Sequence, residues 1–62
     1  MIDPEPERIT YRQPTGDIIT LVRGSFNGKM YSERRVNGVG QAWQGDFEEW
    51  KRFEESIGSE RL

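Results

Sequence analysis

The first half of the chain alternates apolar and polar residues in the way that half-buried strands do. In residues 8–13 (RITYRQ) one polar residue separates the two apolar side chains, which predicts a short strand. Residues 14–17 (PTGD) combine proline with glycine and predict a turn. Residues 18–26 (IITLVRGSF) begin with mostly β-branched side chains, so they predict the strongest strand of the chain.

Two Asn-Gly dipeptides, at residues 27–28 and 37–38, flank the charged segment 29–36 (KMYSERRV). A type I′ hairpin turn needs positive φ at both central residues, which asparagine tolerates and glycine adopts freely. The first dipeptide therefore predicts that residues 29–36 return as a third strand. The second predicts a short fourth strand at residues 39–43 (VGQAW), although the glycines there weaken it.

The register of the two central strands decides which arginines share a face of the sheet. With a two-residue loop between them, Leu21 lies opposite Arg34 and Phe26 lies opposite Lys29. In that register neither face is cleanly apolar. A bulge in the turn would shift the pairing by one residue and redistribute the side chains between the faces, so both registers stay open.

Residues 46–58 (DFEEWKRFEESIG) change to a helical period. Four apolar side chains recur at spacings of three, three and four residues: Phe47, Trp50, Phe53 and Ile57. Asp46 is the predicted N-cap, with Glu49 in the capping-box position, and Gly58 is placed to end the helix. The apolar stripe is predicted to pack on one face of the sheet, and the alternative is a groove-binding face for a partner protein.

Together these elements predict one α+β domain over residues 8–58. It consists of a three- or four-stranded antiparallel β-meander with one C-terminal amphipathic helix packed on one face. Proline alternates with acidic residues near the start of the chain, so residues 1–7 predict an extended acidic arm. The tail at residues 59–62 is expected to fray.

The 62-residue chain contains neither cysteine nor histidine. These absences exclude disulfides, zinc sites of the usual Cys/His kind, and Ser-His or Cys-His nucleophile pairs. No cofactor, metal or small-molecule substrate is expected, and an enzyme is not expected, because so small a domain rarely encloses a pocket that perturbs its carboxylates. The first residues contain no apolar run, so neither a signal peptide nor a membrane span is expected, and a cytoplasmic protein is the default prediction.

The formal net charge is only -2, but the charges are unevenly distributed. Residues 8–45 carry six basic side chains against two acidic ones, whereas residues 46–62 carry six acidic side chains against three basic ones. A basic middle therefore lies between acidic ends, which directs attention to the central strands. The candidate partner-binding residues are Arg23, Lys29, Tyr31, Arg34, Arg35 and Trp43. Whether Trp43 is part of the core or an exposed anchor stays open.

The leading hypothesis is a small non-catalytic binding protein, an adaptor, inhibitor or regulator, that docks on another macromolecule. Its basic sheet face would bind a protein partner with an acidic surface, because arginine pairs bidentately with carboxylates. The alternative is a DNA- or RNA-binding module that uses the central hairpin, with Tyr31 and Phe26 stacking on bases. The overall acidity of the chain favours the first hypothesis, since nucleic-acid binders usually have a high pI.

Overall fold

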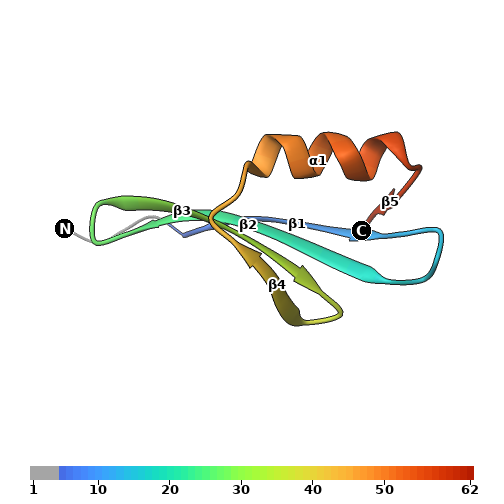
Figure 1. The fold of residues 1–62 in the computed structure, drawn as a ribbon, viewed down its shortest axis with the longest axis horizontal. Helices are drawn as coiled ribbons and strands as arrows, with labels where there is room; N and C mark the ends of the chain where they lie inside the picture. Colours follow the sequence, from blue (N-terminus) through green and yellow to red (C-terminus); the bar gives the residue numbers. More distant parts are fainter. Residues whose placement is uncertain (1–4) are drawn as a thin grey trace.

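The computed structural model describes residues 5–62 and contains a five-stranded antiparallel sheet with one helix over one of its faces (Figure 1). The elements in chain order are β1 (Glu7–Arg12), β2 (Ile18–Phe26), β3 (Lys29–Val36), β4 (Val39–Trp43), α1 (Phe47–Ser56) and β5 (Glu60–Arg61). The predicted α+β meander with one C-terminal helix is confirmed, and the weakly predicted fourth strand is present. Residues 1–4 of the predicted arm lie outside the described residues, and Glu7 already belongs to β1.

The strand order is β4-β3-β2-β1-β5, so the first four strands form consecutive hairpins and β5 returns to the opposite edge. β5 pairs with the end of β1, where Arg12 Nη2 lies 2.7 Å from Glu60 Oε2. The Leu62 N–H donates to the Thr10 carbonyl at 2.9 Å. The expectation that residues 59–62 fray is therefore wrong, because hydrogen bonds to β1 order this tail.

Both Asn-Gly dipeptides adopt the positive φ angles of type I′ turns. φ is 52° at Asn27 and 76° at Gly28 in the first turn, and 50° at Asn37 and 84° at Gly38 in the second. This geometry twists in the same sense as the flanking strands, so it joins β2 to β3 and β3 to β4 through loops of two residues.

The first turn sets the register of β2 and β3 without a bulge at the loop. Leu21 lies opposite Arg34 and Phe26 opposite Lys29, which is the register expected for a two-residue loop. Successive residues of a strand point to opposite faces of the sheet. Arg34 therefore lies on the face that Leu21 occupies, and Arg35 lies on the other.

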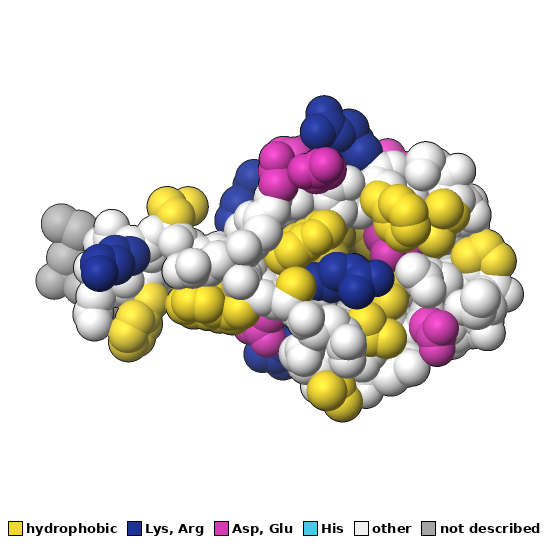
Figure 2. Space-filling view, in the orientation of Figure 1, with side chains coloured by type: hydrophobic (Ala, Val, Ile, Leu, Met, Phe, Trp, Pro, Cys, Tyr) yellow, Lys and Arg dark blue, Asp and Glu magenta, His cyan; other side chains and the backbone are white. Residues whose placement is uncertain are grey.

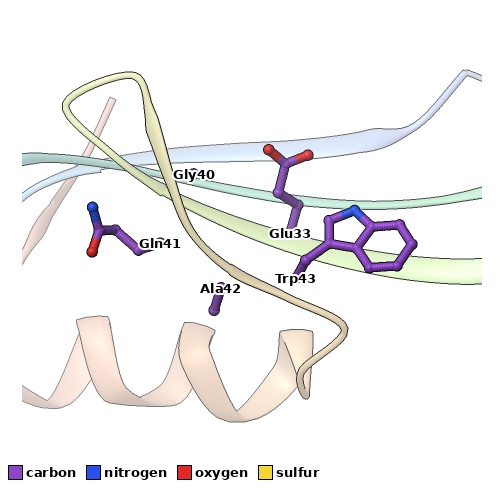
Figure 3. A pocket seen from close by; sticks show the side chains of 5 residues that line it. All are labelled: Glu33, Gly40, Gln41, Ala42 and Trp43. Carbon is purple, nitrogen blue, oxygen red and sulfur yellow. The ribbon is translucent and has the colours of Figure 1, made fainter.

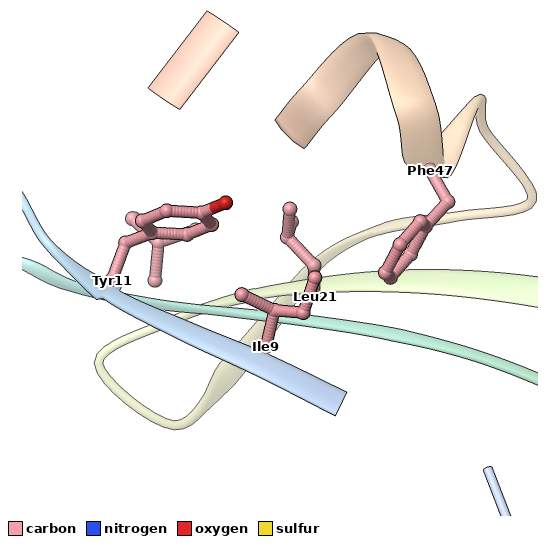
Figure 4. Packing of buried hydrophobic residues seen from close by; sticks show 5 residues of the cluster. Ile9, Tyr11, Leu21 and Phe47 are labelled. Atoms are coloured by element: carbon pink, nitrogen blue, oxygen red, sulfur yellow. The ribbon is translucent and has the colours of Figure 1, made fainter. Parts of the chain in front are cut away.

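The hydrophobic core lies between α1 and the first two strands (Figure 4). Alternate residues of β1 and β2 point toward the helix, and the first residue of the helix completes the cluster: Ile9, Tyr11, Ile19, Leu21 and Phe47. Trp50 packs against this cluster and is half-buried. A Cβ at Gly45 would come within 2.1 Å of the Trp50 ring, so glycine at this position allows the indole to lie against the backbone.

The second half of α1 is oriented differently from the predicted apolar stripe. Phe53 is 53% exposed and Ile57 is also exposed, whereas Glu54 is only 1% exposed. The Glu54 carboxylate accepts two hydrogen bonds from Gln13 Nε2, at 3.0 and 3.1 Å, and one from Ser59 Oγ at 2.7 Å. These bonds hold a polar side chain against the sheet, so the prediction that Phe53 and Ile57 pack there is wrong.

The orientation of α1 predicts opposite outcomes for two phenylalanine truncations. Phe47 is 2% exposed. Phe47→Ala should therefore lower the free energy of unfolding of the protein by about 3–5 kcal/mol, the usual result of deleting a buried aromatic ring. Phe53→Ala is expected to change it by no more than about 0.5 kcal/mol. Urea denaturation of both variants measures the difference, and equal losses would contradict the observed rotation of the helix.

Asn37 connects the second turn to the start of β2. Its side-chain Oδ1 accepts from the Ile18 N–H at 2.9 Å, and its Nδ2 donates to Asp17 Oδ1 at 3.1 Å. Thr15 Oγ1 donates to the other oxygen of Asp17 at 3.0 Å. The hydrogen bond from Asn37, followed by the one from Thr15, lowers the pKa of Asp17 below its ordinary value.

This lowered pKa gives a pH dependence with a definite sign. The hydrogen bonds stabilise the fold above the ordinary pKa of Asp17, and their contribution is lost as the pH falls through the lowered folded-state pKa. Asn37→Gly keeps the positive φ accessible and removes the amide, so the pKa of Asp17 should rise toward its ordinary value in an NMR titration. Asn27→Gly makes the same change in the other turn and should leave the pKa of Asp17 where it is.

Candidate docking surface at the β2–β3 hairpin

The four basic residues among the candidates are divided between the two faces of the sheet. Arg23 and Arg34 lie on the face that α1 covers, while Lys29 and Arg35 lie on the face away from the helix, called the free face below. A basic sheet face on either side therefore contains only two of these four residues. The physical cause is the two-residue turn, since that register places neighbouring positions of β3 on opposite sides.

Arg23 is engaged between the sheet and the start of α1. Its guanidinium carbon lies 4.4 Å from the centroid of the Phe47 ring, a cation–π contact. It also pairs with Glu7 at 2.7 Å and with Glu48 at 3.1 Å. The hydrogen bond with Glu7 is the main reason that the pKa of Arg23 is raised. This side chain joins β1, β2 and α1.

Arg34 is also directed toward the helix. Its side chain is 25% exposed, and Nη2 lies 3.8 Å from Oε1 of the buried Glu54. A cation near this carboxylate offsets part of the cost of burying a charge. Arg34 therefore lies beside the buried Glu54 on the helix side of the sheet, away from the candidate residues on the free face.

Three of the candidate residues do come together, at the end of the β2–β3 hairpin. Tyr31 and Trp43 stack with ring centroids 6.4 Å apart and planes 14° from parallel. Trp43 is 63% exposed, which answers the question left open by the sequence. Lys29 lies beside the two rings, where it lines a hollow of about 120 Å³ with them.

Two further apolar side chains line the same hollow: Phe26, which the nucleic-acid alternative already named as a residue that stacks on bases, and Met30, which the sequence did not indicate as a site residue. Phe26 and Met30 are both exposed at the hairpin end. The hairpin projects beyond α1 (Figure 1), and hydrophobic side chains with a basic one among them gather on this projecting end (Figure 2). We define the hairpin surface by five residues: Phe26, Lys29, Met30, Tyr31 and Trp43.

Local sequence explains why these side chains meet. A Cβ at Gly24 would lie 3.0 Å from the Tyr31 hydroxyl, so the missing side chain of Gly24 leaves room for the tyrosine ring above β2. The Asn-Gly turn places Phe26 beside Lys29. After β4 the chain turns away at Gln44, where φ is 65°. Glycine at 24 was the available signal, because a glycine within a strand often marks a close approach of another group.

An ion pair lies next to the hairpin surface on the free face. Arg35 donates to both carboxylate oxygens of Glu33, and this hydrogen bonding raises the pKa of Arg35. Glu33 lies opposite Trp43 in the β3–β4 pairing. A second hollow of about 230 Å³ follows β4 from here and is lined by Glu33, Gly40, Gln41, Ala42 and Trp43 (Figure 3).

The side chains of the described residues form no candidate metal site. Within residues 5–62 no group of three or more carboxylates is arranged so that it could hold a metal ion. In the same part of the chain no helix has the length and apolar character needed to cross a membrane.

Comparisons of the chain with protein-family models, with curated proteins and with solved structures gave no match.

The packing of Tyr31 over Gly24 predicts the effect of one added methyl group. Gly24→Ala should displace the Tyr31 ring, because the new Cβ would lie 3.0 Å from its hydroxyl and 3.1 Å from Cζ, with Pro6 Cβ also 3.0 Å away. NMR cross-peaks between the rings of Tyr31 and Trp43 should weaken. Gly40→Ala is the control, since its Cβ would meet only Glu33 Oε1, at 3.7 Å. Unchanged cross-peaks in Gly24→Ala would contradict this packing.

Proposed function

We propose that the chain is a small non-catalytic binding protein, an adaptor, inhibitor or regulator, that docks on an acidic protein surface through the hairpin surface. The observation that carries this proposal is the exposed Trp43, stacked on Tyr31 beside Lys29. Stacking holds the indole in one orientation, so little conformational entropy is left to lose on binding. Tryptophan and tyrosine are the residues most often found as binding hot spots.

Charge at the hairpin surface supports an acidic partner. Lys29 is exposed and forms no ion pair within residues 5–62. Arg35 lies on the same face and is 44% exposed, although Glu33 engages it. Both side chains would attract carboxylates during approach and act mainly on the association rate. The exposed phenylalanine, methionine and tryptophan would then supply the apolar contact area.

A polypeptide partner is favoured over nucleic acid because the three arginines of the central strands are already paired. Nucleic-acid binding of useful strength depends on several cations that neutralise phosphates, but Arg23, Arg34 and Arg35 all lie beside carboxylates. DNA or RNA binding is therefore the alternative that the experiment has to test.

The test is a selection from a random linear peptide library displayed on phage, at physiological salt. Selected peptides should be rich in Asp and Glu and contain apolar residues, and their affinity should fall at least about tenfold with Trp43→Ala. Lys29→Glu should slow association. Arg52→Glu is the matched control, because it makes the same change of charge at an exposed position of α1.

Two results would contradict the proposal. One is a set of selected peptides without acidic enrichment, or peptides that bind Trp43→Ala as well as the parent. The other is binding of a single-stranded or duplex oligonucleotide at physiological salt that Lys29→Glu abolishes. In that case log K should fall steeply with log salt, and the nucleic-acid alternative would be correct.

A further inference from the structure

The two edges of the sheet differ in length, charge and exposure. β4 has five residues, all exposed and none charged, and it is the last strand of the sheet formed by the described residues. At the other edge β5 has only two residues, both charged. An edge strand presents unpaired backbone N–H and C=O groups, which natural proteins commonly protect with charged side chains or proline. β4 has neither of these.

A side-chain pocket accompanies this open edge. Gly40 and Trp43 lie on the free face, opposite Arg35 and Glu33 of β3. Because Gly40 has no side chain, the hollow of about 230 Å³ extends along β4 as far as the Trp43 indole (Figure 3). A strand added to β4 would direct every second side chain toward this face, where one of them could occupy the space above Gly40.

The register also contains a feature that restricts pairing. Arg34 lies opposite Ala42 and Arg35 opposite Gly40, so Gln41 has no residue opposite it. A bulge of this kind bends and twists an edge, and it disfavours indiscriminate association. A segment that pairs with β4 therefore needs side-chain contacts as well as backbone hydrogen bonds.

The charges of β3, next to the β4 edge, indicate which kind of side chains a strand added to β4 would carry. On the free face, β3, the neighbour of β4, carries Lys29 and Arg35 against the single acid Glu33. An acidic strand would find a net positive surface there, whereas a second copy of the uncharged β4 would gain no such attraction. We propose that an extended acidic segment of the protein partner adds to β4 as a further strand and places an apolar side chain in the hollow between Gly40 and Trp43.

This inference rests on the proposed function and specifies how the acidic partner binds. The probe is a heptapeptide of alternating Glu and Val, capped at both ends, compared with the same peptide N-methylated at every amide. Both versions carry the same side chains, but only the first can donate backbone hydrogen bonds. The first should bind about tenfold tighter or more, and it should give cross-strand NOEs to the β4 backbone.

A variant of the chain tests the hollow separately. Gly40 lacks a positive φ, and a Cβ there would meet only Glu33 Oε1 at 3.7 Å, so Gly40→Leu should keep the fold and fill the hollow. The affinity for the unmethylated heptapeptide should fall about tenfold or more. Ser56→Leu is the matched control, because it adds an exposed leucine on α1 instead.

The outcomes separate this inference from the proposed function. Equal binding of the two peptides, with both lost in Trp43→Ala, would overturn strand addition and leave docking at the hairpin surface intact. Absence of binding by the heptapeptide and by every acidic peptide would overturn both. If sedimentation shows that the chain dimerises and that Gly40→Leu abolishes the dimer, a second copy occupies β4 and the acidic segment is the wrong occupant.

Discussion

The buried carboxylate of Glu54 determines how the helix lies on the sheet, and much of the molecule depends on it. A charge taken out of water must be paired or fully hydrogen-bonded. Gln13 and Ser59 donate to its oxygens, and Arg34 lies 3.8 Å away. These partners come from the loop before β2, the chain after α1, and β3. One side chain therefore fixes the rotation of α1 and the start of the segment that becomes β5.

The same arrangement determines which cations stay available at the surface. Arg34 lies beside Glu54, and Arg23 lies between Glu7, Glu48 and the Phe47 ring, so the helix side of the sheet uses both. Each of these arginines uses its ion pairs to hold the helix on the sheet. The basic character read from the sequence is then divided between the two layers. On the free face what is left is a smaller charge beside the exposed Trp43 and its stacking partner Tyr31.

Local rules were enough to predict the first four strands and the helix, but they missed β5 and left the register open between a two-residue loop and a bulge. The Asn-Gly dipeptides fix their turns by backbone sterics alone, and the turn at Asn27 then fixes every pair along β2 and β3. The helix could be predicted because its N-cap and spacing are local as well: Asp46 accepts from the Glu49 N–H at 3.2 Å. These features need no knowledge of the rest of the chain.

The rotation of the helix and the position of the site could not be predicted in the same way. Phe53 and Glu54 are adjacent, so a turn of about 100° exchanges which of them meets the sheet. Hydrophobicity favours the phenylalanine, and only the tertiary partners of the carboxylate reverse that preference. Trp43 was undecided for a related reason: its surroundings depend on Tyr31 from another strand, which in turn depends on the space left by Gly24.

Geometry explains why an uncovered surface remains at the β3–β4 side. Five strands spaced by about 4.8 Å extend over about 19 Å, whereas one helix is about 10 Å wide and can cover about half of a face. The ten residues of α1 lie over β1 and β2, where the core cluster is. A chain of 62 residues has no second helix among its described elements to cover β3, β4 and the projecting hairpin. Apolar side chains on those strands stay in water unless a partner covers them, and the two most exposed aromatic residues, Phe26 and Trp43, lie where the fold leaves that space.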